Sequence, residues 1–340
     1  MKFGQLSASP WQRPYLIAEI GVNHEGSIAR AEQMIYDVAE AGGDAVKFQA
    51  YKAERLASQQ SPTYFTQTGE QAPSQFEFFK RYDVFERKDY ERLAKIAERA
   101  GVDFLCTPFD VETVAWLDPL VPAFKIASAD LTFGPLIDRI IQTGKPILLS
   151  TGASTLAEVQ AVVKHIPNRL ILLQCTLSYP CLPQFAQLGV IPALAKQFPQ
   201  CLIGYSDHVP WHLELLTTAW LIGARAIEKH YTVNKEWPGN DHAHAMTKDD
   251  LSALVQRIDH LLPMLGTGSK VVQDCEADAR KYARRSWHVT RDIPSGTVLK
   301  AGDVALKRPG SGLPPEKSPV GKAVKRALQA DQAVMADALV

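Results

Sequence analysis

Residues 15–49, YLIAEIGVNHEGSIARAEQMIYDVAEAGGDAVKFQ, hold the pattern that decides the fold. An apolar run over 15–21 is followed by an amphipathic helical pattern over 27–41 and by a second apolar run over 45–49. Ser27 or Asn23 is suited to cap the beginning of this helix, and Gly42-Gly43 is suited to end it. Strand, helix and strand in this order form a βαβ unit, so the stretch predicts parallel strands covered by helices.

The same unit recurs through residue 230. Further short apolar runs occupy residues 103–107, 123–127, 147–151, 170–175, 202–205 and 224–230, and helical patterns between them include 88–100, 156–165 and 211–221. Strands so continuously apolar are expected to be covered on both faces. Eight strand-helix units in roughly 250 residues fit a closed barrel better than an open sheet. The predicted fold is therefore an α/β (β/α)8 TIM barrel over residues 1–265.

Two segments depart from this repeat. The connection over 51–82 is long, polar and aromatic, and we expect it to be a structured excursion at the active site. After a helical pattern over 248–262, residues 266–282 form a polar linker. Residues 283–340, which include WHVTRDIPSGTVLKAGDVALKRPGSGLPP, show short strands broken by Pro-Ser-Gly, Ala-Gly-Asp and Pro-Gly turns. They predict a small, mostly-β domain.

Composition and charge exclude several classes of protein. The 340 residues carry 37 Lys+Arg against 37 Asp+Glu, and the longest basic cluster is Arg284-Arg285, which disfavours a nucleic-acid surface. Neither a membrane span nor a signal peptide is evident. The five cysteines (Cys106, Cys175, Cys181, Cys201 and Cys275) form no CxxC pair, so a disulfide scaffold or zinc ribbon is disfavoured. We expect a soluble, cytoplasmic protein whose partner is a small molecule.

Polar residues end seven of the eight apolar runs, at the edge where a TIM barrel carries its active site. Lys47 and Lys125 would point into the barrel mouth together with Ser128, Ser150, Thr151 and Ser206. Lysines supply charge and hydroxyls supply short hydrogen bonds, so the group predicts a cradle for a phosphate or carboxylate.

Histidines at two adjacent strand ends are candidate metal ligands. His208 follows the seventh run and His230 ends the eighth, so both imidazoles can reach one divalent cation with open positions, such as Mn²⁺. His242 and His244 are the competing pair, because alternate residues of an extended segment share one face. Both pairs remain open at this point.

Carboxyl groups supply the acid and base candidates. Glu19 and Asp130 lie near the lysines, so they serve either proton transfer or charge compensation. Asp207 and Asp241 are more suited to orienting a histidine or binding hydroxyl groups.

The chain resembles the N-acetylneuraminate (sialic acid) synthase family. The segments that carry the resemblance follow the family's order: IAEIGVNHEGS, AGGDAVKFQ, DFLCTPFD, FKIAS, PILLSTGAST, IGYSDH, AIEKH and GNDHAHAM. The tail from Ala283 resembles the family's C-terminal antifreeze-like (β-clip) domain. The resemblance implies condensation of phosphoenolpyruvate with an N-acylated hexosamine, such as N-acetylmannosamine or a related sugar. The products are a nine-carbon nonulosonic acid and phosphate.

The resemblance also implies roles for particular residues. A divalent cation, Mn²⁺ with Mg²⁺ or Co²⁺ as alternatives, is held by His208 and His230. Phosphoenolpyruvate is bound by Lys47, Thr107, Lys125, Ser128, Ser150 and Ser206. The sugar contacts Gln49, Tyr179, Asp241 and, from the second subunit of a domain-swapped homodimer, Arg308. Glu19 and Asp130 stay the catalytic candidates, and either could activate the water that adds at C2 or protonate the nascent alkoxide.

Two departures from the family pattern leave the acceptor sugar open. Asp130 stands where the family usually has Glu, and the loop LSYPCLPQFAQL, residues 177–188, lacks the family's acidic pair. A 2,4-diacetamido hexose, a phosphorylated sugar and no catalysis are all compatible with this loop. The alternatives are a synthase forming a heptulosonate or octulosonate phosphate, which should lack the tail domain, and a catalytically silent sugar-binding barrel. An ice-binding tail is disfavoured because its turns are charged and show no flat repeat of threonines.

Overall fold

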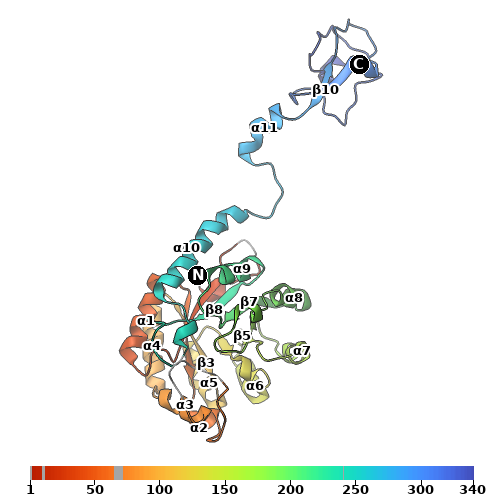
Figure 1. Ribbon diagram of the computed structural model, residues 1–340. Coiled ribbons are helices and arrows are strands. Elements are labelled where there is room, and N and C mark those ends of the chain that lie inside the picture. The colour runs from red at the N-terminus through yellow and green to blue at the C-terminus, as the bar shows by residue number, and fades with distance from the viewer. Residues whose placement is uncertain (1, 10–11, 65–71, 240) are drawn as a thin grey trace. The chain divides into compact units, whose positions relative to one another are not determined.

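The computed structural model describes residues 2–9, 12–64, 72–239 and 241–340 (Figure 1). The chain divides into two compact units, Met1–Thr267 and Gly268–Val340. The first holds an eight-stranded parallel barrel, and the second holds a small antiparallel sheet.

The barrel strands follow the apolar runs of the sequence. They are β1 (Tyr15–Gly21), β2 (Ala45–Ala50), β3 (Asp103–Pro108), β4 (Phe124–Ile126), β5 (Ile147–Ser150), β6 (Leu170–Cys175), β7 (Leu202–Asp207) and β8 (Ala226–His230). Hydrogen bonds join them in the order β3-β2-β1-β8-β7-β6-β5-β4. The two strands that end this order, β3 and β4, lie next to each other, so the sheet curls into a nearly closed barrel. The predicted (β/α)8 architecture is confirmed.

Helices pack around the strands, as Figure 1 shows. Besides two helices in the connection after β2, the helices of the barrel unit are α1 (Ile28–Glu40), α4 (Arg87–Ala100), α5 (Val111–Leu117), α6 (Gly134–Ile141), α7 (Leu156–His165), α8 (Val190–Gln197), α9 (Leu213–Leu221) and α10 (Lys248–Leu265). The predicted first cap is confirmed, because the Ser27 side chain accepts a hydrogen bond from the Arg30 amide. Gly42, with φ of +85°, follows the end of the same helix.

Alternation along β1 shows how the barrel separates its two cores. Tyr15 and Ile17 belong to an inner core, whereas Leu16 and Ala18 belong to the outer core that the helices cover. A short 3-10 helix, η1 (Phe3–Gln5), contributes Phe3 to the inner core, where its ring meets Tyr15 edge to face. The interior is therefore apolar at the amino-terminal end of the strands, and its polar residues lie at the other end.

The long connection after β2 is partly helical. It contains α2 (Ala53–Leu56) and α3 (Gln75–Tyr82). Residues 65–71 of the predicted excursion lie outside the described residues. Further 3-10 turns of the barrel unit are η2 (Asp118–Leu120), η3 (Ser128–Asp130), η4 (Pro183–Phe185) and η5 (His242–His244).

The second unit has its own small core. Its elements are η6 (Asp274–Glu276), α11 (Ala277–Tyr282), β9 (Ser286–Val289), η7 (Ala301–Asp303), β10 (Val304–Lys307) and η8 (Ala336–Ala338). β9 and β10 pair antiparallel, and the core around them includes Val289, Ile293 and Val334. The predicted mostly-β tail is confirmed. Within the described ranges, no helix is both long and apolar enough to cross a membrane.

Candidate functional site

A cavity of about 420 Å³ opens at the carboxyl ends of the barrel strands. The structure brings together in its lining thirteen of the predicted site residues: Glu19, Lys47, Gln49, Thr107, Lys125, Ser128, Asp130, Ser150, Tyr179, Ser206, His208, His230 and Asp241. Arg308 belongs to the second unit, so its role stays a prediction. The convergence follows from topology, because parallel strands end at a common rim.

Four buried charged groups form the floor of this cavity. Lys47 Nζ lies 2.5 Å from Glu19 Oε2 and 3.8 Å from Glu228 Oε1, and Lys125 Nζ lies 3.2 Å from that same Glu228 oxygen. Each of the four residues is at most 5% exposed. Strand register produces this contact, because Glu19 on β1 stands level with Lys47 on β2. The floor is thus electrically balanced, with two ammonium groups against two carboxyl groups.

Burial and pairing shift the pKa values of these groups in different directions. Burial alone would lower the pKa of Lys47, yet Glu19 and Glu228 raise it. Burial lowers the pKa of Lys125, and it raises that of Glu19 against the opposing effect of Lys47. Burial acts to raise the pKa of Glu228, but Lys125 and Lys47 together lower it. Lys125 is therefore the lysine that gains most from an added anion.

The hydroxyl groups around the floor are partly engaged. Thr107 Oγ1 accepts a hydrogen bond from Lys47 Nζ at 3.2 Å, and Ser206 Oγ donates to Glu228 at 3.2 Å. Ser128 Oγ accepts from the Gly152 amide at 3.0 Å. A Cβ at Gly152 would lie 2.9 Å from that Oγ, so this contact needs glycine. Ser150 Oγ is buried without a hydrogen-bond partner, which leaves it for a ligand.

Thr151 does not join this group. Its hydroxyl donates to the Leu173 carbonyl oxygen at 3.0 Å, and it lines a second hollow instead of the main cavity. The expectation that Thr151 belongs to the cradle is therefore wrong, because Thr151 follows the last residue of β5 and turns toward β6.

His208 and His230 face each other across the rim. Their ring centroids are 5.4 Å apart, and each residue is 6% exposed. His208 Nδ1 lies 2.8 Å from the Thr176 carbonyl oxygen, so the neutral ring carries its proton on Nδ1 and has its lone pair on Nε2. Burial acts to lower the pKa of His208, but Cys175 and the Thr176 carbonyl raise it. Burial, with the neighbouring His244 and His208, lowers the pKa of His230 well below its ordinary value. A neutral imidazole is the form that binds a cation.

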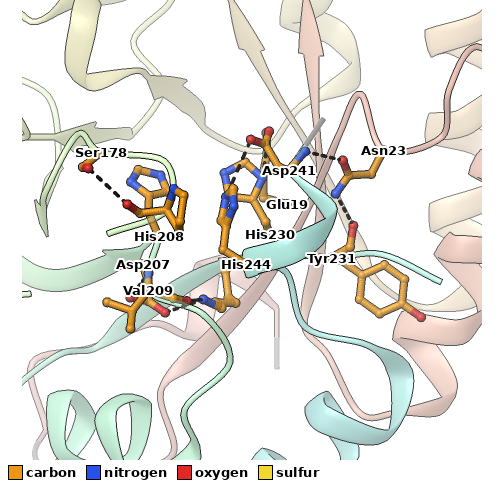
Figure 2. Close-up of polar contacts among 12 residues, drawn as sticks. Glu19, Asn23, Ser178, Asp207, His208, Val209, His230, Tyr231, Asp241 and His244 are labelled. Atoms are coloured by element: carbon orange, nitrogen blue, oxygen red, sulfur yellow. Dashed lines mark hydrogen bonds and ion pairs between the residues drawn. The ribbon is translucent and has the colours of Figure 1, made fainter. Parts of the chain in front are cut away.

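Asp241 and His244 lie beside His230, as Figure 2 shows. Asp241 Oδ2 is 3.4 Å from His230 Nδ1, and Asp241 Oδ1 is 3.6 Å from His244 Nε2. The Asp241 amide donates to Asn23 Oδ1, and Asn23 donates to the Tyr231 carbonyl oxygen, which ties this segment to the end of β8. Burial raises the pKa of Asp241 to about 7, and Glu19 adds to the effect.

The competing pair His242 and His244 does not share one face. The segment forms the 3-10 turn η5 instead of an extended strand, so the two imidazoles have different surroundings. His242 Nδ1 lies 2.7 Å from Thr232 Oγ1, and its ring meets Trp237 edge to face. His244 packs near His230 and Tyr179. The extended geometry expected for this pair is wrong.

Two aspartates differ in their surroundings. Asp130 is half-buried at the end of η3, its Oδ2 has no hydrogen-bond partner, and burial raises its pKa to about 6 against the opposing effect of Lys125. Asp207 accepts hydrogen bonds from the Tyr205 hydroxyl and from Lys229 at 2.6 Å. The expectation that Asp207 orients a histidine or binds ligand hydroxyls is therefore wrong, because alternation turns it away from the cavity.

Glu228 was not predicted at the site, although it contacts both floor lysines; its signal was a carboxyl two residues before His230, on the same face of β8. The outer wall is aromatic, with Tyr51 after β2, Phe78 and Phe79 from α3, and Phe109 after β3. The expectation that the 51–82 connection lies at the active site is confirmed by Tyr51, Phe78 and Phe79, whereas Phe109 was not predicted there.

Comparison with known families adds an independent finding. The model of the NeuB family matches residues 34–270, and the model of the SAF domain matches residues 284–340. An N,N'-diacetyllegionaminic acid synthase of Legionella pneumophila is 34% identical over 314 residues, covering 89% of this chain and 87% of that protein. An N-acetylneuraminate-9-phosphate synthase of Homo sapiens is 31% identical over 332 residues, covering 94% and 91%.

Among solved structures, an N-acetylneuraminic acid (sialic acid) synthetase of Leptospira borgpetersenii, in complex with citrate, superposes with a TM-score of 0.70. It is 30% identical to this chain and covers 79% of it, and 90% of that structure is matched.

Proposed function

The chain belongs to the NeuB family, and on that premise we propose that it condenses phosphoenolpyruvate with an N-acylated hexosamine to give a nonulosonic acid and phosphate. One observation carries the proposal. Thirteen predicted site residues, drawn from all eight strands or the loops after them, line a single cavity. This cavity holds buried charged groups, a hydroxyl group without a partner and two imidazoles. Such a combination suits a small anionic substrate and a polar co-substrate.

We place phosphoenolpyruvate at the floor. Lys47 and Lys125 supply positive charge, and the Ser150 hydroxyl, which has no partner, supplies a hydrogen bond. Glu228 is ion-paired with Lys125 in the ligand-free site, so an incoming phosphate or carboxylate shares the Lys125 ammonium group with Glu228. The bound anion would raise the pKa of Lys125, which burial has lowered.

The residues at the rim fit a divalent cation. His230 Nδ1 is buried without a hydrogen-bond partner, and His208 presents Nε2 because its other nitrogen faces a carbonyl oxygen. We propose that these two imidazoles hold the cation, with Mn²⁺ preferred and Mg²⁺ or Co²⁺ as alternatives. A divalent cation, when bound, polarises the carbonyl oxygen of the open-chain sugar as a Lewis acid.

The condensation moves three protons. When C3 of phosphoenolpyruvate bonds to the aldehyde carbon, the sugar oxygen gains a proton. Water adds at C2 and loses a proton; the C2–O bond to phosphate then breaks while the new C2 hydroxyl becomes the C2 carbonyl and gives its proton to the departing phosphate. Glu19 and Asp130 are the carboxyl groups proposed for these transfers. The pKa of Asp130, raised to about 6 by burial, suits exchange in either direction near neutral pH.

The acceptor end of the cavity favours an uncharged sugar. Its wall is formed by aromatic side chains, among them Phe78 and Phe109. Lys47 and Lys125 are the only Lys or Arg residues among the described lining residues, and both lie at the floor. We therefore propose an unphosphorylated N-acyl hexosamine, whose acyl groups contact the aromatic wall. We also keep the prediction that Arg308 of a domain-swapped homodimer contacts the sugar.

Phosphate release tests the proposal directly. The full-length chain is incubated with phosphoenolpyruvate, Mn²⁺ and a panel of N-acyl hexosamines, and the product is identified by mass. We expect phosphate and a nine-carbon keto acid in equal amounts. Release of phosphate with no acceptor would count against it, because it would show hydrolysis of phosphoenolpyruvate instead of condensation. No release with any acceptor would also count against it and favour a silent sugar-binding barrel.

A further inference from the structure

His244 lies next to His230, one of the proposed cation ligands, although it comes well after the end of β8 in the sequence. The chain after β8 folds back along the strand end, because the Met246 amide donates to the His230 carbonyl oxygen at 2.7 Å. The Thr232 amide in turn donates to the Met246 carbonyl oxygen at 2.9 Å. This return brings the His244 ring to 5.0 Å from that of His230.

The His244 imidazole is buried and has an unused nitrogen. The residue is 3% exposed, and its Nε2 has no hydrogen-bond partner. The same is true of Nδ1 in His230, which is 6% exposed. Buried imidazole nitrogens that lack partners are uncommon, because each loses its hydrogen bonds to water. Two such nitrogens flanking one carboxylate point to a ligand.

The spacing of these groups matches a metal site. One potential ligand atom each of His230, Asp241 and His244 lies within 4.8 Å of the others. The two carboxylate-to-imidazole distances, 3.4 and 3.6 Å, are long for hydrogen bonds. Ligands that each lie about 2.1 Å from one ion are separated by about 3.0 to 3.5 Å. The observed separations, each measured to a different oxygen of Asp241, fall near that range.

We propose that His244 and Asp241 complete the donor set of the cation, so that the neighbouring side chains of His230, Asp241 and His244 hold it together with His208. Two imidazoles and one carboxylate suit divalent first-row metals. His208 lies outside this three-residue group and faces it from β7. The inference rests on the proposed function only for the presence of a cation, since it concerns binding and not turnover.

Equilibrium binding of Mn²⁺ to the full-length protein is the test. Metal is removed with EDTA and dialysis, and free Mn²⁺ is then titrated by its electron paramagnetic resonance signal without substrate. His244→Gln should weaken Mn²⁺ binding at least tenfold, because loss of even an outer partner of a ligand costs about 10- to 100-fold. With Co²⁺, the same variant should change the visible absorption spectrum, which reports the number of ligands.

Two control variants separate ligand loss from disturbance of the fold. His242→Gln alters the same turn at a histidine outside the three-residue group, and His165→Ala alters an exposed histidine on α7. Both should bind Mn²⁺ like the unmodified protein. If His244→Gln unfolds, as judged by its melting temperature without metal, His244→Asn replaces it.

The outcomes distinguish this inference from the proposed function. Unchanged Mn²⁺ affinity and Co²⁺ spectrum in His244→Gln would overturn the inference, as would equal weakening in His242→Gln. Catalysis by the unmodified protein would leave the proposed function standing in either case. Conversely, weakened binding in His244→Gln supports the inference even if no sugar is turned over. Failure of the unmodified protein to bind Mn²⁺ or Co²⁺ would overturn it together with the cation assignment.

Discussion

Replacing Asp130 by Asn should stabilise the barrel at neutral pH. The Asp130 carboxyl is half-buried and its Oδ2 has no hydrogen-bond partner. Burial raises its pKa from 3.8 to about 6, and Lys125 offsets only part of this effect. The folded protein therefore ionises this group at a cost in free energy. An amide of nearly the same shape removes the charge and keeps the volume.

The pKa values set the size and pH range of the effect. A pKa of about 6 in place of 3.8 corresponds to about 3 kcal/mol at most. Partial exposure of Asp130 reduces this, so we expect about 1 to 2 kcal/mol. Because the folded pKa is raised, the wild-type protein loses stability as pH rises from about 4 to about 6, and the loss is complete above that range. The Asn variant lacks this dependence.

Differential scanning calorimetry of the ligand-free protein measures the difference. At pH 7.5 the melting temperature of Asp130→Asn should exceed that of the wild type by about 2 to 8 °C, since 1 kcal/mol shifts a domain of this size by about 2 to 4 °C. At pH 5 the gain should be about half as large. Asp259→Asn, at an exposed position on α10, is the matched control. An equal or lower melting temperature at pH 7.5, or a gain independent of pH, would refute the reasoning.

Four further predictions concern the same cavity. Lys125→Met should lower the free energy of unfolding by about 3 to 5 kcal/mol, because it leaves the Glu228 carboxylate without its nearest cation. Denaturant unfolding should show that adding Glu228→Gln restores part of this loss, and no restoration would contradict the pairing. His208→Ala and His230→Ala should each abolish turnover while circular dichroism remains unchanged, and full activity in either would remove that residue from the cation site. Arg308→Ala should raise the KM for the sugar and leave the KM for phosphoenolpyruvate unchanged, whereas an unchanged sugar KM would argue against its role. A hexosamine 6-phosphate should show a kcat/KM at least about tenfold below that of its unphosphorylated form, because the described acceptor wall has no cation; the reverse preference would place a basic group there.

Much of the fold was predictable because the apolar runs are long and well separated. Periodicity located β1 and β6 to the residue, and Ser27 fixed the beginning of α1. The convergence of Lys47 and Lys125 was predictable for the same reason, since parallel strands end at one rim.

Contacts that depend on turn geometry were not predictable. The turn η5 separates His242 from His244, and nothing in an alternating His-Ala-His pattern distinguishes a 3-10 turn from a strand. The position of Thr151 depended on where β5 ends, which periodicity locates only to within a residue or two. The pairing of Glu228 with both floor lysines required the register of β8 against its neighbours.

The ion pair between Lys229 and Asp207 has a consequence for the fidelity of folding. β8 sends Glu228 and His230 into the barrel and Lys229 to the opposite face, where its ammonium group is buried against the Asp207 carboxylate at 2.6 Å. A slip of β8 by one residue would exchange the two faces. It would bury the Lys229 ammonium group inside the barrel without Asp207, and it would place Glu228 and His230 against the apolar helices. The Lys229–Asp207 pair therefore raises the free energy of the misaligned barrel relative to the native one, and it does so before any substrate is present.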